Sequence, residues 1–270
     1  MKTKKLDHLS EIYNEYDAFL IDLWGVMHNG IRLNASAMNV VKELDEKGKR
    51  IVFLSNAPRP NKKVVEFLKK LKMEEKFLKN ILTSGEAALN SLKKNKFGKK
   101  FYHLGPQRDD SLFIDIIKNK TTLEKCDFIL CTGLFDEQEE NLKYYEELLK
   151  NSINKKLVCT NPDLIVHRGG EEEYCAGKIA EIFENLGGEV IYFGKPHKEV
   201  YNSCLMKSQN TLVIGDNLKT DIKGANNMNL DSIFITGGVH TNKINNEEIV
   251  EKLLKEHNVS ANYFQKELTW

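Results

Sequence analysis

Polar residues of the kinds that handle phosphate groups follow four separate apolar stretches of this chain. Asp22 follows the letters AFLI, Ser55 and Asn56 follow IVFL, Lys195 follows IYFG, and Asp216 follows TLVIG. Short apolar runs of this kind predict buried strands. In open parallel sheets the ligand crevice lies outside the carboxyl ends of the strands. We therefore expect these side chains to meet at one edge of a sheet.

The motif GDNLKTD adds a further carboxylate, Asp221, shortly after Asp216. Two or three carboxylates at one sheet edge repel one another unless a hard cation lies among them, which points to Mg²⁺. A lysine and a hydroxyl nearby suit a phosphoryl group. Gly215 would let the backbone come close to the site, and Asp221 would orient the residues that bind the metal. The pattern predicts a magnesium-dependent phosphoryl-transfer site.

Short apolar runs alternate with amphipathic stretches, a pattern typical of parallel strands joined by helical crossovers. The fold class is therefore α/β, with a doubly wound, Rossmann-like parallel sheet. In the outer parts of the chain we expect strands at 18–22, 50–54, 80–83, 211–215 and 231–235, helices at 36–47, from 61, at 197–208 and at 218–228, and a charged helix with a tail at the end.

The middle of the chain repeats this pattern and is predicted to be an inserted α/β domain. We expect strands at 100–104, 127–131 and 156–159, helices at 109–118 and 137–149, and an exposed charged turn from His167 to Glu173. We assign residues 1–83 and 193–270 to a catalytic core and residues 84–192 to an inserted cap.

Length and composition exclude several other classes of protein. The chain has 270 residues, 41% of them hydrophobic, which suffices for one large domain or two modest ones and argues against disorder. Its 40 basic and 39 acidic residues nearly cancel, which argues against nucleic acid as a partner. Five cysteines form no CxxC pair, and no apolar window reaches the length of a membrane span. We expect a soluble cytoplasmic protein with buried thiols and no membrane partner.

The order of the motifs resembles a known family. The pattern DxxGV at Asp22, the pair Ser55-Asn56, GKP at 194–196 and GDNLKTD at 215–221 are similar to the haloacid dehalogenase-like (HAD) superfamily of phosphotransferases. The phrases IVFLSN, NPD at 161–163, CAGKIAEIFENLGG and GKPHKEVY resemble its class IIA branch, which contains NagD-like sugar and nucleotide phosphatases and pyridoxal phosphate phosphatases. The resemblance spans roughly residues 17–240, and the letters DLWGV resemble one subfamily's first motif.

This resemblance implies a role for each matching residue. Asp22 would be the nucleophile that forms an aspartyl-phosphate, and it would also bind Mg²⁺. Ser55 would bind the phosphate, and Lys195 would hold the nucleophile and phosphoryl group together. Asp216 would coordinate the metal and Asp221 would ligate or orient beside it. The backbone carbonyl of Trp24 would be a further metal ligand. The implied substrate is a small phosphorylated metabolite, and a homodimer through the cap is compatible with the resemblance.

A cap that faces the crevice must supply substrate contacts. Its candidates are Asn161, Asp163, His167 and Arg168, and we assign substrate binding to Asn161 and Arg168 together with Ser55, Asn56 and Lys195. Ordinary loop polarity is an equal alternative for these residues of the insertion.

Trp24 departs from the family's pattern, which usually has a second aspartate here to protonate the leaving oxygen and then activate water. An indole N–H donates a hydrogen bond but does not exchange a proton near neutral pH. General acid–base catalysis contributes ~10²–10⁴-fold, so its loss should fall mainly on poor leaving groups such as alkoxides. His28 is a candidate replacement base, and Trp24 itself has a core-packing aromatic as its alternative role.

Two other functions are alternatives to a phosphatase. The first is a catalytically weak or inactive protein that binds Mg²⁺ and a phosphorylated ligand as a sensor or regulatory partner; Trp24 favours it, whereas Asp22, Lys195 and Asp216 favour the enzyme. The second, a dinucleotide-binding domain, fails because no GxGxxG follows the first strand. Structural alternatives also stand for the acidic pair, with Asp216 as a helix N-cap and Asp221 as a helix-surface residue.

Overall fold

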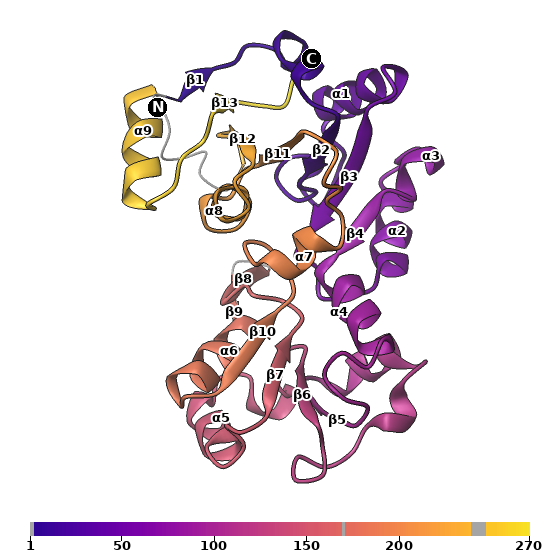
Figure 1. Ribbon diagram of the computed structural model, residues 1–270, viewed down its shortest axis with the longest axis vertical. Coiled ribbons are helices and arrows are strands. Elements are labelled where there is room, and N and C mark those ends of the chain that lie inside the picture. Colours follow the sequence, from indigo (N-terminus) through magenta and orange to yellow (C-terminus); the bar gives the residue numbers. More distant parts are fainter. Residues whose placement is uncertain (1–2, 169–170, 239–246) are drawn as a thin grey trace. The chain divides into compact units, whose positions relative to one another are not determined.

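The computed structural model describes residues 3–168, 171–238 and 247–270 (Figure 1). The chain divides into two compact units, each made of several segments. The first unit contains Met1–Ser55, Lys62–Leu82 and Lys195–Trp270, and the second contains Asn56–Asn61 and Thr83–Gly194. Each unit has its own sheet and its own hydrophobic core.

The first unit is built on a seven-stranded sheet with the order β1-β13-β12-β11-β2-β3-β4. Its central strands β12, β11, β2 and β3 pair in parallel, so their carboxyl ends lie at one edge. The strands are β1 (Lys4–Lys5), β2 (Ala18–Ile21), β3 (Arg50–Ser55), β4 (Ile81–Thr83), β11 (Thr211–Gly215), β12 (Asp231–Ile235) and β13 (Tyr263–Gln265).

Alternate residues of these strands face two separate layers of helices, which makes the sheet doubly wound. Ile233 and Ile235 of β12 belong to the larger core, whereas Phe234 between them belongs to a second core on the other face. The larger core contains residues of α1 (Ala35–Glu46), α2 (Asn61–Lys70) and α3 (Glu75–Leu78), and the second contains residues of α9 (Glu247–Glu256). The short helices α7 (Lys198–Asn202) and α8 (Lys223–Asn227) complete this unit.

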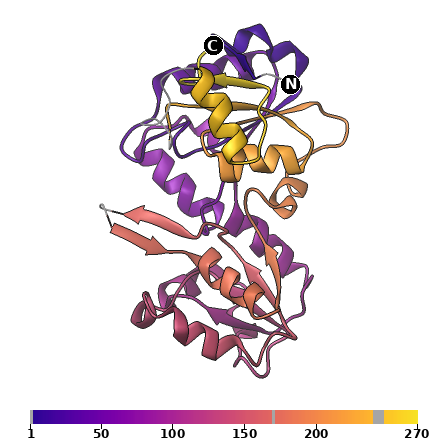
Figure 2. The ribbon, with the colours of Figure 1, turned by 90° about the vertical axis from the view of Figure 1, so that its left-hand side faces the viewer.

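The second unit is built on a four-stranded parallel sheet with the order β10-β7-β6-β5 and a separate antiparallel hairpin, β8 and β9. Figure 2 shows the hairpin as an arm beside the sheet of its own unit. The strands are β5 (Phe101–Leu104), β6 (Phe128–Cys131), β7 (Lys156–Cys159), β8 (Ile165–Arg168), β9 (Glu171–Tyr174) and β10 (Glu189–Tyr192), and the helices are α4 (Ser84–Lys93), α5 (Leu142–Leu149) and α6 (Ala176–Asn185).

The predicted fold class, a doubly wound α/β sheet of Rossmann-like type, is confirmed. Several local predictions are wrong. The segment expected to be a helix at 109–118 forms 3₁₀ turns at Gln107–Phe113 and Ile117–Asn119, and the helix expected at 197–208 is only α7. In the charged segment expected to be a turn, His167 and Arg168 end β8 and residues 171–173 belong to β9, whereas residues 169–170 lie outside the described residues. Ile165, Val166 and Tyr174, which flank the segment, are residue types with high strand propensity.

The five cysteines are all buried, so the prediction of buried thiols is confirmed. Within the described residues, no helix combines the length and apolar character needed to cross a bilayer.

The core of the second unit provides a stability prediction. Phe183 of α6 is fully buried, and its ring lies so close to Gly188 that a Cβ there would collide with it. Phe183→Ala should lower the free energy of unfolding by roughly 3–5 kcal/mol, because it leaves a cavity in addition to the lost apolar burial. Urea unfolding followed by circular dichroism measures this. Ile114→Ala in the same unit removes a side chain that is 68% exposed and should change stability by at most about 0.5 kcal/mol. Equal effects of the two substitutions would contradict the packing argument.

Candidate active site

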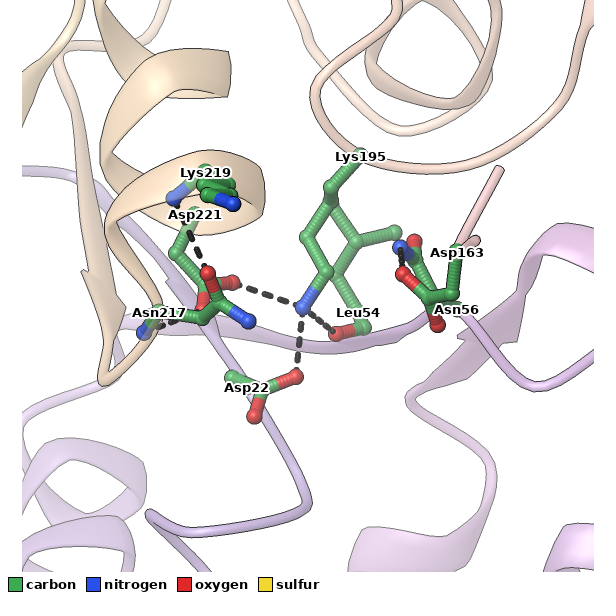
Figure 3. Close-up of polar contacts among 8 residues, drawn as sticks. All are labelled: Asp22, Leu54, Asn56, Asp163, Lys195, Asn217, Lys219 and Asp221. Atoms are coloured by element: carbon green, nitrogen blue, oxygen red, sulfur yellow. Dashed lines mark hydrogen bonds and ion pairs between the residues drawn. The ribbon is translucent and has the colours of Figure 1, made fainter. Parts of the chain in front are cut away.

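The ammonium group of Lys195 lies at the centre of a buried polar cluster in the first unit (Figure 3). Its Nζ donates hydrogen bonds to the carboxylate of Asp22, to Oδ1 of Asp221 at 2.7 Å and to the carbonyl oxygen of Leu54 at 3.0 Å. Lys195 is only 3% exposed. A buried ammonium needs such partners, because burying an unpaired charge is very costly.

Strand register explains why these groups meet. Ile21 of β2 pairs with Phe53 of β3 on one side and with Ile214 of β11 on the other. The three strands therefore end at the same edge of the sheet, with β11 one residue and β3 two residues longer than β2 there. Asp22 follows β2 directly, and its backbone N–H donates to the carbonyl of Ile214 at 2.9 Å. The sequence predicted that polar side chains at these strand ends would meet at one edge of the sheet. Asp22 and Lys195 do meet there.

Three carboxylates gather beside Lys195. Asp22, Asp216 and Asp221 are all buried, and one oxygen atom from each lies within 4.8 Å of the others. Carboxylate oxygens are the ligands that Mg²⁺ prefers, and a group this compact suits one hard cation. The donor set therefore fits the magnesium ion that the sequence predicted.

Electrostatics supports the same interpretation. Burial raises the pKa of Asp22 well above its ordinary value, and the nearby carboxylates of Asp221 and Asp216 raise it further, whereas Lys195 opposes the shift. Burial disfavours the charged form of Lys195, but Asp22 and Asp221 outweigh that effect and raise its pKa. A cation among the carboxylates would favour their ionised forms, including the form of Asp22 that can act as a nucleophile.

Asp221 is held on both of its oxygens. Oδ1 accepts from Lys195, and Oδ2 accepts the backbone N–H of Asn217 at 3.2 Å. Asn217 in turn caps the π-helical turn Leu218–Ile222, since its side chain accepts from the N–H of Lys219 at 2.9 Å. Asp221 is 1% exposed, so its alternative role as a helix-surface residue is wrong. Its fixed carboxylate is suited to orienting Lys195.

Two glycines enclose the carboxylate of Asp216, and neither was assigned a role from the sequence. A Cβ built on Gly25 or on Gly238 would fall within that carboxylate, closer than real side chains approach. Gly25 also has a φ of +89°, which glycine adopts without strain. Two features of the sequence could have indicated these close approaches of the backbone: the glycine directly after Trp24, and the Gly-Gly pair after the strand β12. Both glycines give Asp216 its place in the site.

Trp24 lies beside the site but outside the core, because its side chain is 59% exposed. Its alternative role as a core-packing aromatic is therefore wrong. Its ring meets that of His28 edge to face, with the centroids 5.4 Å apart.

His28 is buried between Trp24 and Phe67, and burial lowers its pKa to about 4. Its Nδ1 accepts the backbone N–H of Gly30 at 3.1 Å. A neutral imidazole with its lone pair occupied is a poor proton acceptor. The geometry therefore does not favour His28 as the replacement base.

The remaining sequence candidates fall in different places. Ser55 ends β3, next to the Leu54 carbonyl that binds Lys195. In the second unit, Asp163 accepts from the Asn56 side chain at 3.1 Å, and its own N–H donates to Oδ1 of Asn161 at 3.0 Å. The side chains of His167 and Arg168 lie outside the described residues. The substrate-binding roles of Ser55, Asn56, Asn161, Arg168 and Lys195 stay predictions.

Comparisons with known proteins agree with this geometry. The family model described as haloacid dehalogenase-like hydrolase matches residues 19–116, and a HAD-hydrolase-like model matches residues 192–257. An acid sugar phosphatase of Staphylococcus aureus (strain MRSA252) is 25% identical over 238 residues, covering 84% of this chain and 89% of that protein.

Solved structures match over nearly the whole chain. A haloacid dehalogenase-like hydrolase from Brucella suis 1330 is 28% identical, with a TM-score of 0.76 and coverage of 98% of this chain and 100% of that one. A p-nitrophenyl phosphatase from Archaeoglobus fulgidus shares the fold, with a TM-score of 0.75, 18% identity and coverage of 93% and 96%.

The chain belongs to the haloacid dehalogenase-like hydrolases. It also shares its fold with a putative nagD protein, at 24% identity and with a TM-score of 0.69. Its placement in a subfamily marked by the letters DLWGV stays a prediction.

The packing around Asp216 provides a test of the metal site. Gly25→Ala should weaken Mg²⁺ binding by about 10- to 100-fold, because the new methyl group would displace the carboxylate of Asp216, which is predicted to hold the metal. Isothermal titration calorimetry measures the affinity. Gly187→Ala is the matched control, since Gly187 has a similar φ of +92° but no atom within 4 Å of its would-be Cβ. If both variants bind Mg²⁺ equally, the carboxylate of Asp216 does not hold the ion.

Proposed function

We propose that this protein is a Mg²⁺-dependent phosphatase that hydrolyses a small phosphorylated metabolite through an aspartyl-phosphate on Asp22. The observation that carries the proposal is the buried Lys195 ammonium between Asp22 and Asp221, with Asp216 completing a compact group of carboxylates. Mg²⁺ held by Asp22, Asp216, Asp221 and the backbone carbonyl of Trp24 would neutralise charge on the phosphoryl oxygens.

In the first step a carboxylate oxygen of Asp22 attacks phosphorus, and the bond from phosphorus to the leaving oxygen breaks. Lys195 keeps that carboxylate in place and offers positive charge to the phosphoryl group. Asp221, fixed by Asn217, holds the ammonium in position. The hydroxyl of Ser55 would bind a phosphoryl oxygen. In the second step water attacks phosphorus, the bond between phosphorus and the Asp22 oxygen breaks, and a proton of the water passes to solvent, which releases phosphate and restores the Asp22 carboxylate.

Proton transfer is the weak part of this mechanism. Trp24 occupies the position of the usual acid, and the lone pair of His28 Nδ1 already accepts a hydrogen bond. The lack of an acid slows the reaction less when the leaving group is activated, because such a group departs without being protonated. We therefore propose that the enzyme favours substrates with activated leaving groups.

The second unit is proposed to be the class IIA cap, corresponding to residues 84–192, which would close over the substrate and exclude water. Asn161 and Arg168 would contribute to its selectivity among sugar, nucleotide and pyridoxal phosphate types of substrate. Buried thiols suit a reducing compartment, so we propose a cytoplasmic enzyme. A binding-only sensor is not favoured, since relatives carry phosphatase names.

The role of Asp22 has a direct test. Asp22→Asn should abolish Mg²⁺-dependent release of 4-nitrophenol from 4-nitrophenyl phosphate, because an amide oxygen is a poor nucleophile. Asp231→Asn is the control: this carboxylate lies in the same sheet and accepts from Tyr16 and Asn262, away from the Lys195 cluster. It should retain activity. Turnover in the unaltered protein no greater than in Asp22→Asn would refute the proposed phosphatase.

The leaving-group preference is tested separately. The unaltered enzyme should hydrolyse aryl phosphates with a kcat/KM about 10²–10⁴-fold above that for alkyl phosphates. Trp24→Asp should raise kcat/KM for alkyl phosphates by supplying the missing acid. Trp24→Asn should not raise it, because asparagine is similar in size to aspartate but has no proton to exchange. Steady-state kinetics on both substrate classes gives these values. Equal rates for aryl and alkyl phosphates in the unaltered enzyme would show that another group protonates the leaving oxygen.

A further inference from the structure

The indole of Trp24 is both exposed and held in place. Its side chain is 59% exposed, yet a Cβ on Gly30 would lie 2.6 Å from Cη2 and 3.0 Å from Cζ3 of the ring. The edge-to-face contact with His28 fixes the ring from another direction, and His28 is itself packed against Phe67 with centroids 5.3 Å apart. An exposed aromatic ring that is already fixed costs little conformational entropy when a ligand packs on it.

This ring lines a cavity that also reaches the proposed metal site. The cavity has a volume of about 800 Å³, within the range of small-molecule sites. Its walls include Trp24, Gly25 and Asp216, together with the polar side chains of Asn29, Arg32 and Lys266. All of these residues belong to the first unit. A group held in this cavity would therefore contact the indole while lying close to a carboxylate of the site.

We propose that Trp24 is a specificity-determining residue whose indole stacks on the planar aromatic group of the substrate. This inference rests on the proposed phosphatase function and narrows its substrate to phosphate monoesters of planar aromatic groups. Planar aromatic rings gain from stacking on an indole beyond the area that they bury, and a saturated ring of the same size lacks the second π-system of such a pair. The polar side chains of the cavity would pair with substituents on such a ring. Trp24 thus contributes to binding at a position where it contributes no proton.

Binding of two uncleavable ligands tests the proposal without any turnover. Phenylphosphonate and cyclohexylphosphonate have similar size and the same anionic group, and neither contains a phosphoester bond. With Mg²⁺ present, calorimetry on the unaltered enzyme should show about two- to tenfold tighter binding of the phenyl compound. Trp24→Leu should remove this preference, and Trp24→Phe should retain part of it.

Ile31→Ser is the matched control for loss of exposed apolar surface. Ile31 is 83% exposed and lies in the same loop as Gly30, but it does not line the cavity. This variant should keep the preference for the phenyl compound. A preference that survives in Trp24→Leu, or the absence of any preference or binding in the unaltered enzyme, would overturn the proposal.

Fluorescence supplies a second readout, because the chain has only two tryptophans. Trp270 packs against Tyr13 with centroids 4.9 Å apart, and Trp270→Phe leaves Trp24 as the single tryptophan, which can be excited selectively over the tyrosines. Phenylphosphonate should change the emission of this variant, and cyclohexylphosphonate should change it less. Identical responses to both ligands would count against stacking. These binding results are independent of catalysis, so a protein that hydrolyses no phosphomonoester can still pass or fail this test.

Discussion

The buried ion pairs of Lys195 are the interaction on which the site depends. One ammonium group connects the end of β2, the end of β3 and the π-helical turn after β11. Removing one partner from such a buried network typically costs about 3–5 kcal/mol, because a charge is left without compensation. The same contacts that would position the nucleophile therefore also hold three chain segments together. Stability and chemistry share one set of atoms in this region.

The sequence predicted the strands around this cluster well, because apolar runs such as AFLI and TLVIG have few alternatives to a buried parallel strand. It also placed Asp22, Lys195 and Asp216 at strand ends and Asp221 shortly after Asp216, and the structure brings these four side chains together. It did not predict the π-helical turn that aims Asp221 at Lys195, since this geometry depends on tertiary contacts. Nor did it predict the exposure of Trp24, because hydrophobicity alone favours burial for that residue type.

The replacement of an acid by Trp24 changes what the position can contribute. An aspartate acts on one proton of the leaving group, whereas an indole offers a flat aromatic surface to whatever organic group lies beside it. Under the proposed function, catalytic power towards alkoxides would be exchanged for selectivity towards planar groups. The orientation of the Trp24 ring is fixed by its contacts with His28 and Gly30. His28 is held in turn by its packing against Phe67.

The division of the chain into units has a mechanical consequence. The chain crosses between the two units four times, after Ser55, Asn61, Leu82 and Gly194. Ser55 and Lys195, which are both predicted to bind the phosphate, thus lie directly at two of the points where the chain passes from one unit to the other. The buried ammonium of Lys195 anchors this residue in the first unit, so the chain is held in place where it leaves the second unit. A rotation of the inserted unit would be absorbed in the bonds at the four crossings, and under the proposed function two of these crossings adjoin groups that would hold the phosphate.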